Sequence, residues 1–183
     1  MEYTFSPALA DELPAVFALI KDRIAWMDEV GLHQWNVLDY WGVFPESYYS
    51  AAVREGRLFV VHDCNGAVAG AGVLSFRDHF WHGDASPALY LHNFVTARHA
   101  KGAGDAFLAG CERFALAHNK SLFRLDCAAD NTVLNDYYAA RGFAAAGTVE
   151  DGPYKGILRE KQLYRSSPGG VTRRWGMVFR ATY

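Results

Sequence analysis

The residues of this chain that most clearly suggest chemistry are three with almost no side chain, Gly102, Ala103 and Gly104. They follow a strand-like run and stand where an amphipathic helix is expected to begin. A helix start leaves backbone N–H groups unpaired with the positive end of the helix dipole behind them, and glycine lets a bulky group approach those amides closely. The run from Lys101 to Asp105 therefore predicts a cradle for a phosphate.

Two well-known phosphate cradles do not fit this run. No G-x-x-x-x-G-K-[ST] segment occurs, and the third glycine of a G-x-G-x-x-G fingerprint would fall on Phe107. A plain turn between strand and helix stays open as an alternative for an isolated G-x-G. The run is not isolated, however, because Asn131 and then Tyr137 and Tyr138 follow after one further strand-like segment.

Hydrophobic periodicity predicts the elements that must position these residues. In order, they are a strand over 2–6, a helix from Pro7 to Gly31, a helix from Pro45 to Gly56, a hairpin over 57–76, a strand over 88–96, a helix after Gly104, a strand over 121–129, a helix from Asn131 closed by Gly142, and strands over 143–149 and 157–164. A tail over 166–183 could form one more hairpin. The order predicts a single mixed α/β domain over residues 1–183.

Composition narrows the class of protein. Of the 183 residues, 51% are apolar and 21% charged, as in a globular domain, and the net charge of −2 gives no reason to expect a nucleic-acid partner. The three cysteines show no paired spacing, so no disulfide framework is expected. No membrane-length apolar run occurs, and the first residues lack the basic start and apolar core of a signal peptide. We therefore expect a cytoplasmic protein with no membrane partner.

Together, the segments YLHNFVTARHAKGAGDAFL and FRLDCAADNTVLNDYYAARGF resemble the GNAT superfamily, the acyl-CoA-dependent N-acetyltransferases. The family's cofactor motif, [QR]-x-x-G-x-[GA], corresponds to residues 99–104, with His99 in place of the usual Gln or Arg. Its next landmark, an Asn followed by an aromatic pair and Gly-Phe, corresponds to Asn131, the two tyrosines and Gly142–Phe143. The run between Trp26 and Trp35 is similar to one in uncharacterised bacterial members. The resemblance implies a central mixed, mostly antiparallel sheet flanked by helices.

The resemblance also implies acetyl-CoA as co-substrate, attacked directly by an amine in a ternary complex. The pyrophosphate would lie on the backbone amides of the cradle, and Asn131 would lie beside the cofactor. The peptide-like pantetheine arm would pair with the edge of a strand. The residues expected to bind acetyl-CoA are Phe94, Val95, Thr96, Lys101, Gly102, Ala103, Gly104, Asp105, Asn131 and Tyr138.

Tyr138 is the proton donor to the departing thiolate that the resemblance implies. Helical spacing places Tyr138 on a stripe with Leu134 and Arg141, and places Tyr137 on a more apolar stripe with Val133 that we expect to be buried. The alternative for Tyr138 is a tyrosine at the edge of the core.

The attacking amine must lose a proton, and the family uses a carboxylate, a histidine or a chain of waters for this task. On the strand over 88–96 the candidates are His92 and Tyr90, which point to the same face. The imidazole of His92 titrates near pH 6.5, which suits a base at neutral pH. A histidine that is only hydrogen-bonded within the sheet stays open, and Asp126 is a weaker candidate that we expect to be structural.

The family binds its acceptor between the first two helices and the central strands. Here that region is rich in aromatic residues, and we expect Trp26, Trp35 and Tyr90 to contact the acceptor by stacking or by cation–π interaction. An aromatic minicore is the alternative. His79 and His82 are expected to be loop residues, not metal ligands.

The sequence therefore predicts an N-acetyltransferase acting on a small-molecule amine, without a metal, and a homodimer is possible. A non-catalytic acyl-CoA sensor and a peptide or protein Nα-acetyltransferase are the alternatives.

Overall fold

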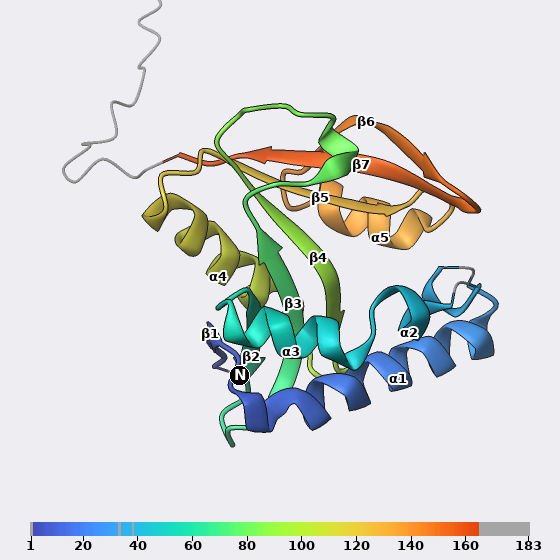
Figure 1. Cartoon of the computed structure of the whole chain (residues 1–183), viewed down its shortest axis with the longest axis vertical. Helices are drawn as coiled ribbons and strands as arrows, with labels where there is room; N and C mark the ends of the chain where they lie inside the picture. The colour runs from blue at the N-terminus through green and yellow to red at the C-terminus, as the bar shows by residue number, and fades with distance from the viewer. Residues whose placement is uncertain (1, 33, 38, 165–183) are drawn as a thin grey trace, which may run out of the picture.

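Seven strands form one twisted sheet in the computed structural model, which describes residues 2–32, 34–37 and 39–164 (Figure 1). The spatial order is β1-β2-β3-β4-β5-β7-β6. The strands are β1 (Thr4–Pro7), β2 (Leu58–His62), β3 (Val68–Ser75), β4 (Ala88–Thr96), β5 (Leu122–Ala128), β6 (Ala144–Asp151) and β7 (Tyr154–Gln162).

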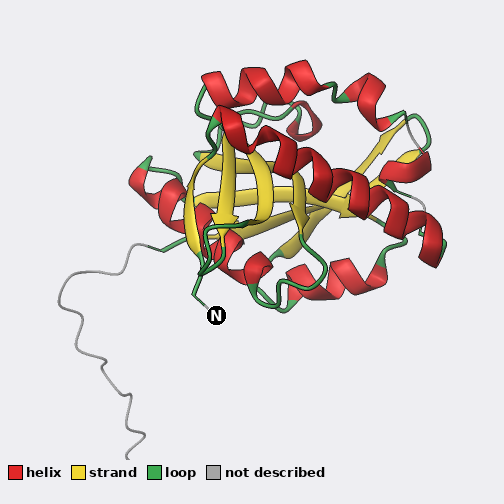
Figure 2. Ribbon diagram, turned by 90° about the horizontal axis from the view of Figure 1, so that it is seen from below, coloured by secondary structure: helices red, strands yellow, loops and turns green. Residues whose placement is uncertain are grey.

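Helices cover both faces of this sheet (Figure 2). They are α1 (Leu13–Val30), α2 (Tyr40–Val43), α3 (Glu46–Arg54), α4 (Ala103–Ala117) and α5 (Thr132–Ala139), with short 3-10 turns η1 (Ala10–Glu12), η2 (Trp35–Val37) and η3 (His79–Trp81). Helices α1 and α3 pack on one face over β2, β3 and β4. Helices α4 and α5 pack on the other face against a second core that includes Phe107, Phe123 and Tyr138.

The central feature of the sheet is the separation of β4 from β5. These two strands are parallel, and in the described part of the chain they pair only at Ala88–Tyr90 with Leu122–Arg124. Beyond that point β5 follows β7 along its whole length, and Figure 1 shows both strands turning away from β4. The second half of β4 therefore has an edge without a strand partner among the described residues.

The predicted strands and helices within the described residues are present, with two corrections. The first helix begins at Leu13, not at Pro7, because Pro7 ends β1 and the chain makes a 3-10 turn before α1. The segment after Gly31 contains η2 and α2 where the sequence predicted only a connection. Gly31 and Gly142 end their helices with φ of 70° and 85°, as predicted. The predicted C-terminal hairpin lies outside the described residues.

No helix within these described ranges is long and apolar enough to cross a bilayer.

Candidate functional site

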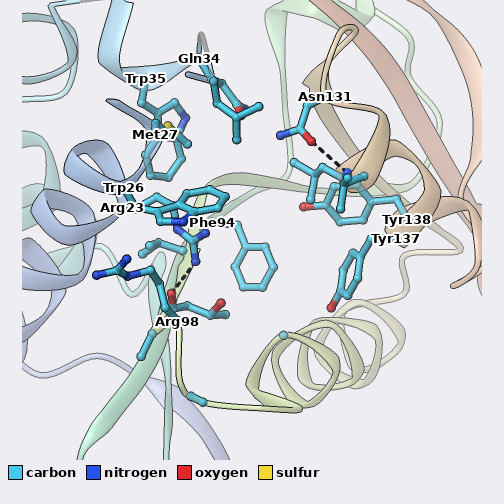
Figure 3. Close-up of a pocket in the computed structure, with 18 of the residues that line it drawn as sticks. Arg23, Trp26, Met27, Gln34, Trp35, Phe94, Arg98, Asn131, Tyr137 and Tyr138 are labelled. Carbon is cyan, nitrogen blue, oxygen red and sulfur yellow. Dashed lines mark hydrogen bonds between the residues drawn. The ribbon is translucent and has the colours of Figure 1, made fainter. Parts of the chain in front are cut away.

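A cleft of about 850 Å³ opens where β4 and β5 separate. Its walls come from α1, the free edge of β4, the start of α4 and one side of α5 (Figure 3). The lining residues are Arg23, Trp26, Met27, Val30, Leu32, Gln34, Trp35, Phe94, Val95, Thr96, Ala97, Arg98, Ala100, Gly102, Gly104, Asp105, Asn131, Val133, Leu134, Tyr137, Tyr138 and Arg141.

One end of the cleft is the helix start that the sequence singled out. Within the described part of the chain, the amide N–H groups of Gly102, Gly104 and Asp105 donate no hydrogen bond to the protein. The amide of Lys101 donates to the carbonyl of His99, and the amide of Ala103 donates to the carbonyl of Ala100. Lys101 and Ala103 do not line the cleft. The predicted cradle of five amides therefore narrows to three, which is still an anion site at the positive end of α4.

A different physical constraint requires a small residue at each of the three positions 102–104. Gly102 has a φ of 86°, a left-handed conformation that other residues rarely adopt. Ala103 is fully buried beneath the helix start. A Cβ at Gly104 would lie 2.5 Å from the hydroxyl oxygen of Tyr137, so only glycine fits without displacing that tyrosine.

Three guanidinium groups surround this end of the cleft, and each is held by a protein acceptor. Arg98 forms ion pairs with Asp22 and Glu29 of α1. Arg141 pairs with Asp105, and its guanidinium carbon lies 3.4 Å from the centre of the Tyr137 ring. The Asp105 pair raises the pKa of Arg141, and Arg141 in turn lowers the pKa of Asp105.

The third of these groups ties α1 to the edge of β4. Arg23 donates a hydrogen bond of 2.9 Å from Nη2 to the carbonyl oxygen of Thr96 (Figure 3), and burial lowers its pKa. The side chains of Phe94 and Val95 belong to opposite faces of the sheet, because Phe94 packs on Phe107 and Val95 lies in the α1–α3 core.

An irregularity in β4 lies directly before this edge. Asn93 has a φ of 50°, and the pairing of β4 with β3 shifts register there. Its side chain accepts a hydrogen bond from the Tyr48 hydroxyl at 3.2 Å and donates one to the Tyr40 hydroxyl at 3.0 Å. Burial raises the pKa of Tyr40 to about 12, so that hydroxyl keeps its proton at neutral pH. Two tyrosines from α2 and α3 thus hold the bulge of β4 in one conformation.

The tyrosine pair on α5 lies differently from the predicted arrangement. Tyr138 is the buried member, 4% exposed, whereas Tyr137 is partly exposed and Val133 is 80% exposed. The predicted burial of the Tyr137 stripe was therefore wrong: the core contacts come from Tyr138 packing on Phe143, while Val133 lies on the first turn at the rim of the cleft.

The two hydroxyl groups also point in different directions. Figure 3 shows the Tyr138 hydroxyl directed into the cleft and the Tyr137 hydroxyl directed towards α4, where it donates a hydrogen bond of 2.9 Å to Asp105. Burial raises the pKa of Tyr138 well above its usual value, so its hydroxyl is protonated throughout the neutral range. Tyr138 is thus the member of the pair whose protonated hydroxyl faces the cleft.

His92 lies on the opposite face of the sheet from Tyr138. Its side chain is 28% exposed, and Nε2 lies 3.6 Å from a carboxylate oxygen of Asp78, a residue of the β3–β4 loop. Burial lowers the pKa of His92, opposed by the charges of Asp78 and Asp126. At neutral pH the imidazole is therefore uncharged and able to accept a proton.

Comparison with known proteins places this arrangement in a family. Residues 20–143 match the profile of the acetyltransferase (GNAT) family. The chain belongs to this family. It is 23% identical over 164 residues to YesJ of Bacillus subtilis (strain 168), described as an uncharacterised N-acetyltransferase, with 86% of this chain and 88% of YesJ covered. The match confirms the resemblance seen in the sequence and makes the chain an acyltransferase of the acetyltransferase class.

Solved GNAT structures share the fold. An acetyltransferase from Listeria monocytogenes 4b F2365 superposes with a TM-score of 0.74 at 24% identity, over 89% of this chain and 96% of that one. The PaiA N-acetyltransferase from Thermoplasma acidophilum, solved in complex with coenzyme A, superposes with a TM-score of 0.69 at 13% identity, over 88% and 99% of the two chains. The predicted mixed, mostly antiparallel sheet flanked by helices is thereby confirmed.

Two of the three residues predicted to contact the acceptor, Trp26 and Trp35, line this cleft. Trp26 stacks beneath the guanidinium of Arg23, 4.9 Å from the ring centre, and Trp35 packs on Tyr40 with ring centres 4.9 Å apart. Tyr90 does not line the cleft. It is 2% exposed and its hydroxyl accepts a hydrogen bond from Arg124, so we assign it to packing.

The structure also accounts for Asn131 and for the loop histidines. The side-chain oxygen of Asn131 accepts a hydrogen bond of 3.0 Å from the amide of Leu134 and so caps α5, while the residue lines the cleft (Figure 3). Among the residues that the structure describes, no group of three His, Cys, Asp or Glu side chains could hold a metal ion.

Sequence reasoning missed two residues that shape this site, Arg23 and Asn93. A cation within the apolar pattern of the first helix was the available signal for Arg23. An asparagine inside a strand was the signal for Asn93, since asparagine tolerates the left-handed conformation better than most residues.

Proposed function

We propose that this chain transfers the acetyl group of acetyl-CoA to the amine of a small-molecule acceptor, by direct attack in a ternary complex. The observation that carries the proposal is the order of groups along one cleft. Three free amides stand at one end, the Tyr138 hydroxyl projects from the middle of the wall, and aromatic side chains line the other end. The coenzyme A bound by the Thermoplasma relative supports the choice of donor.

The cleft suits the chemical groups of acetyl-CoA. A pyrophosphate is an anion that the amides of Gly102, Gly104 and Asp105 can receive, and the glycines leave room for close approach. The pantetheine arm carries amides like those of a peptide, and the unpaired edge of β4 at Phe94–Thr96 offers backbone partners for them.

We assign the two proton transfers to Tyr138, which lines the cleft, and to His92, which does not line it but lies on β4 just beyond the part paired with β5. An uncharged His92 can take a proton from the attacking amine, and a protonated Tyr138 can give one to the thiolate that leaves. The two side chains belong to opposite faces of the sheet, where β4 and β5 separate. This arrangement lets one group act on the amine while the other acts on the sulfur.

The acceptor end favours a small molecule over a protein chain. Trp35, Met27 and Leu32 line it, and the helix α2 that follows them packs its Tyr40 ring on Trp35. This aromatic wall offers a stacking surface to a small acceptor, whereas a peptide acceptor needs an open groove.

A thermal-shift titration with acetyl-CoA tests the donor site. Ligand at about 100 times its dissociation constant adds about 2.7 kcal/mol to the free energy of unfolding. For a domain of this size that corresponds to a rise in Tm of about 5–10 °C. Gly104→Glu, which places a charged side chain in the cradle, should abolish the rise, and Ala139→Glu on the exposed side of α5 should keep it. A full rise in Gly104→Glu would remove the cradle from the proposal.

Activity is then measured by mass spectrometry of amine mixtures incubated with acetyl-CoA. Wild-type protein should acetylate small amines, and Tyr138→Phe should bind acetyl-CoA normally but transfer the acetyl group slowly. Binding without any transfer would leave a non-catalytic acyl-CoA-binding protein in place of the enzyme.

A further inference from the structure

Asp126 is a mostly buried carboxylate that the proposed chemistry has not yet used. It lies on β5 beyond the last residue that pairs with β4. Its neighbours Leu125 and Cys127 belong to the core under α4 and α5, so strand alternation directs Asp126 to the opposite face. His92 lies on that same face of β4, because Leu91 belongs to the α4–α5 core.

The carboxylate of Asp126 has a hydroxyl partner and no cationic one. Tyr154, the first residue of β7, donates a hydrogen bond of 2.5 Å to Oδ2. No lysine or arginine in the described part of the chain forms an ion pair with Asp126. In the same part of the chain, a second buried carboxylate, that of Asp78, forms ion pairs with the imidazoles of His79 and His92 and with no lysine or arginine. A region with two such carboxylates attracts a cation.

Asp126 acts electrostatically on both groups of the proposed proton transfers, Tyr138 and His92. Its charge helps to raise the pKa of Tyr138, and it opposes the lowering of the pKa of His92, so it lies near both. Its own pKa is raised by burial, against the opposing effects of the Tyr154 hydrogen bond and of His92. The titratable groups that act on it are therefore Tyr154 from β7, His92 from β4 and Asp78 from the β3–β4 loop, while Tyr138 belongs to the α4–α5 core on the other face.

Asp126 itself lines neither cavity, but its hydrogen-bond partner lines one of them. Tyr154 lines a second cavity, of about 250 Å³, together with residues of η2 and of the turn before β7. Gln34 lines both this cavity and the large cleft, so the two adjoin at that residue. The acceptor end of the cleft beside Gln34 is apolar, with Met27 and Trp35 in its wall.

We propose that Asp126 binds the protonated amine of the acceptor, and that the acceptors are primary alkylamines with an apolar body, which are ammonium ions at neutral pH. This inference rests on the acetyl transfer proposed above. The ammonium ion gives one proton to His92, and the amine nitrogen then bonds to the thioester carbonyl carbon. The carbon–sulfur bond breaks, the thiolate takes a proton from Tyr138, and the second amine proton replaces the one that Tyr138 gave. The products are an N-alkylacetamide, coenzyme A and one released proton.

Equilibrium binding separates this inference from the proposed enzyme activity. Calorimetry at pH 7 on the coenzyme A complex would use benzylamine, hexylamine and putrescine with wild type, Asp126→Asn and Asp136→Asn. Asparagine keeps the shape of Asp126 and still accepts from Tyr154, and Asp136 is an exposed carboxylate on α5 that serves as the control. We expect Asp126→Asn to bind the preferred ammonium ion at least tenfold more weakly than wild type or Asp136→Asn, while all three bind coenzyme A equally.

A pH series adds a readout that loss of packing would not reproduce. Tyr154→Phe removes the hydrogen bond that stabilises the ionised carboxylate, so the pKa of Asp126 rises further. Ammonium binding should then be lost at a higher pH than in wild type as the pH falls. An unshifted profile would contradict the assignment of Asp126 as the binding group.

The transfer assay compares benzylamine with aniline, which differ by one methylene but of which only benzylamine is charged at neutral pH. Asp126→Asn should lose at least tenfold in kcat/KM for benzylamine and change little for aniline. Equal binding of the ammonium ions by wild type and Asp126→Asn, no binding of any of them to wild type, or equal loss of activity with both amines would each overturn the inference. Ammonium binding that depends on Asp126, without acetyl transfer, would keep this inference and overturn the proposed activity.

Discussion

Replacing Gly104 by alanine tests how the cradle and α5 fit together. The new Cβ would lie 2.5 Å from the hydroxyl oxygen of Tyr137, closer than any real contact, while the next atoms are the Tyr137 ring carbon at 3.5 Å and a Phe94 ring carbon at 3.9 Å. The hydroxyl cannot move freely, because it donates to Asp105 and its ring lies against the Arg141 guanidinium. The crowding therefore comes from one oxygen atom.

Tyr137→Phe removes that oxygen and should therefore remove the destabilisation caused by Gly104→Ala. Overpacking costs about 1–3 kcal/mol, against which alanine gains up to about 1 kcal/mol over glycine in a helix. Gly104→Ala should thus lower the free energy of unfolding by about 1–2 kcal/mol in wild type. In the Tyr137→Phe protein the same change meets only contacts of 3.5 Å or more, so it should be neutral or stabilise by up to about 1 kcal/mol.

The assay is a double-mutant cycle by urea unfolding on wild type, both single variants and the double variant. The coupling energy between the two sites should be about 1–3 kcal/mol, well above the few tenths expected of independent sites. In thermal unfolding, each 1 kcal/mol would appear as about 2–4 °C for a domain of this size. Additive effects, or a Gly104→Ala protein as stable as wild type, would refute the reasoning from this contact.

Three further predictions concern the reaction. Tyr138→Phe should lower kcat about 10²-fold with an unchanged affinity for acetyl-CoA, measured by steady-state kinetics and titration; a parallel loss of both would assign the hydroxyl to binding. His92 must be uncharged to accept a proton, and burial lowers its pKa, so activity should fall only as the pH drops below about 6.5. His92→Gln should lower the activity at neutral pH and abolish this fall at acidic pH. An identical pH profile in the variant would exclude His92 as the base. Asn93→Gly keeps the positive φ but loses the hydrogen bonds to Tyr40 and Tyr48, whereas Asn93→Ala also strains the backbone. The kcat should therefore be highest in wild type, lower in the glycine variant and lowest in the alanine variant. Equal activities of the two variants would contradict a role for the bulge.

The sequence by itself determined most of the strands and helices and the place of the glycine cradle. Glycines at 102 and 104 between a strand and a helix carry the cradle because the signal is local: backbone dihedrals and helix-start amides depend on neighbouring residues. The signal of Gly142 is also local, which is why its left-handed conformation at the end of α5 was predicted correctly, whereas the capping role of Asn131 was not predicted.

Only the tertiary structure decided which side of α5 is buried and what surrounds the gap. Tyr138 is buried because Phe143 and the core under β5 receive it, and helical spacing cannot say which stripe a neighbour will cover. Asp126 accepts a hydrogen bond from Tyr154, 28 residues away in the sequence, and it shares a face of the sheet with His92 of β4. These arrangements depend on the pairing of strands that are far apart in the sequence, so no local pattern of residue types predicts them.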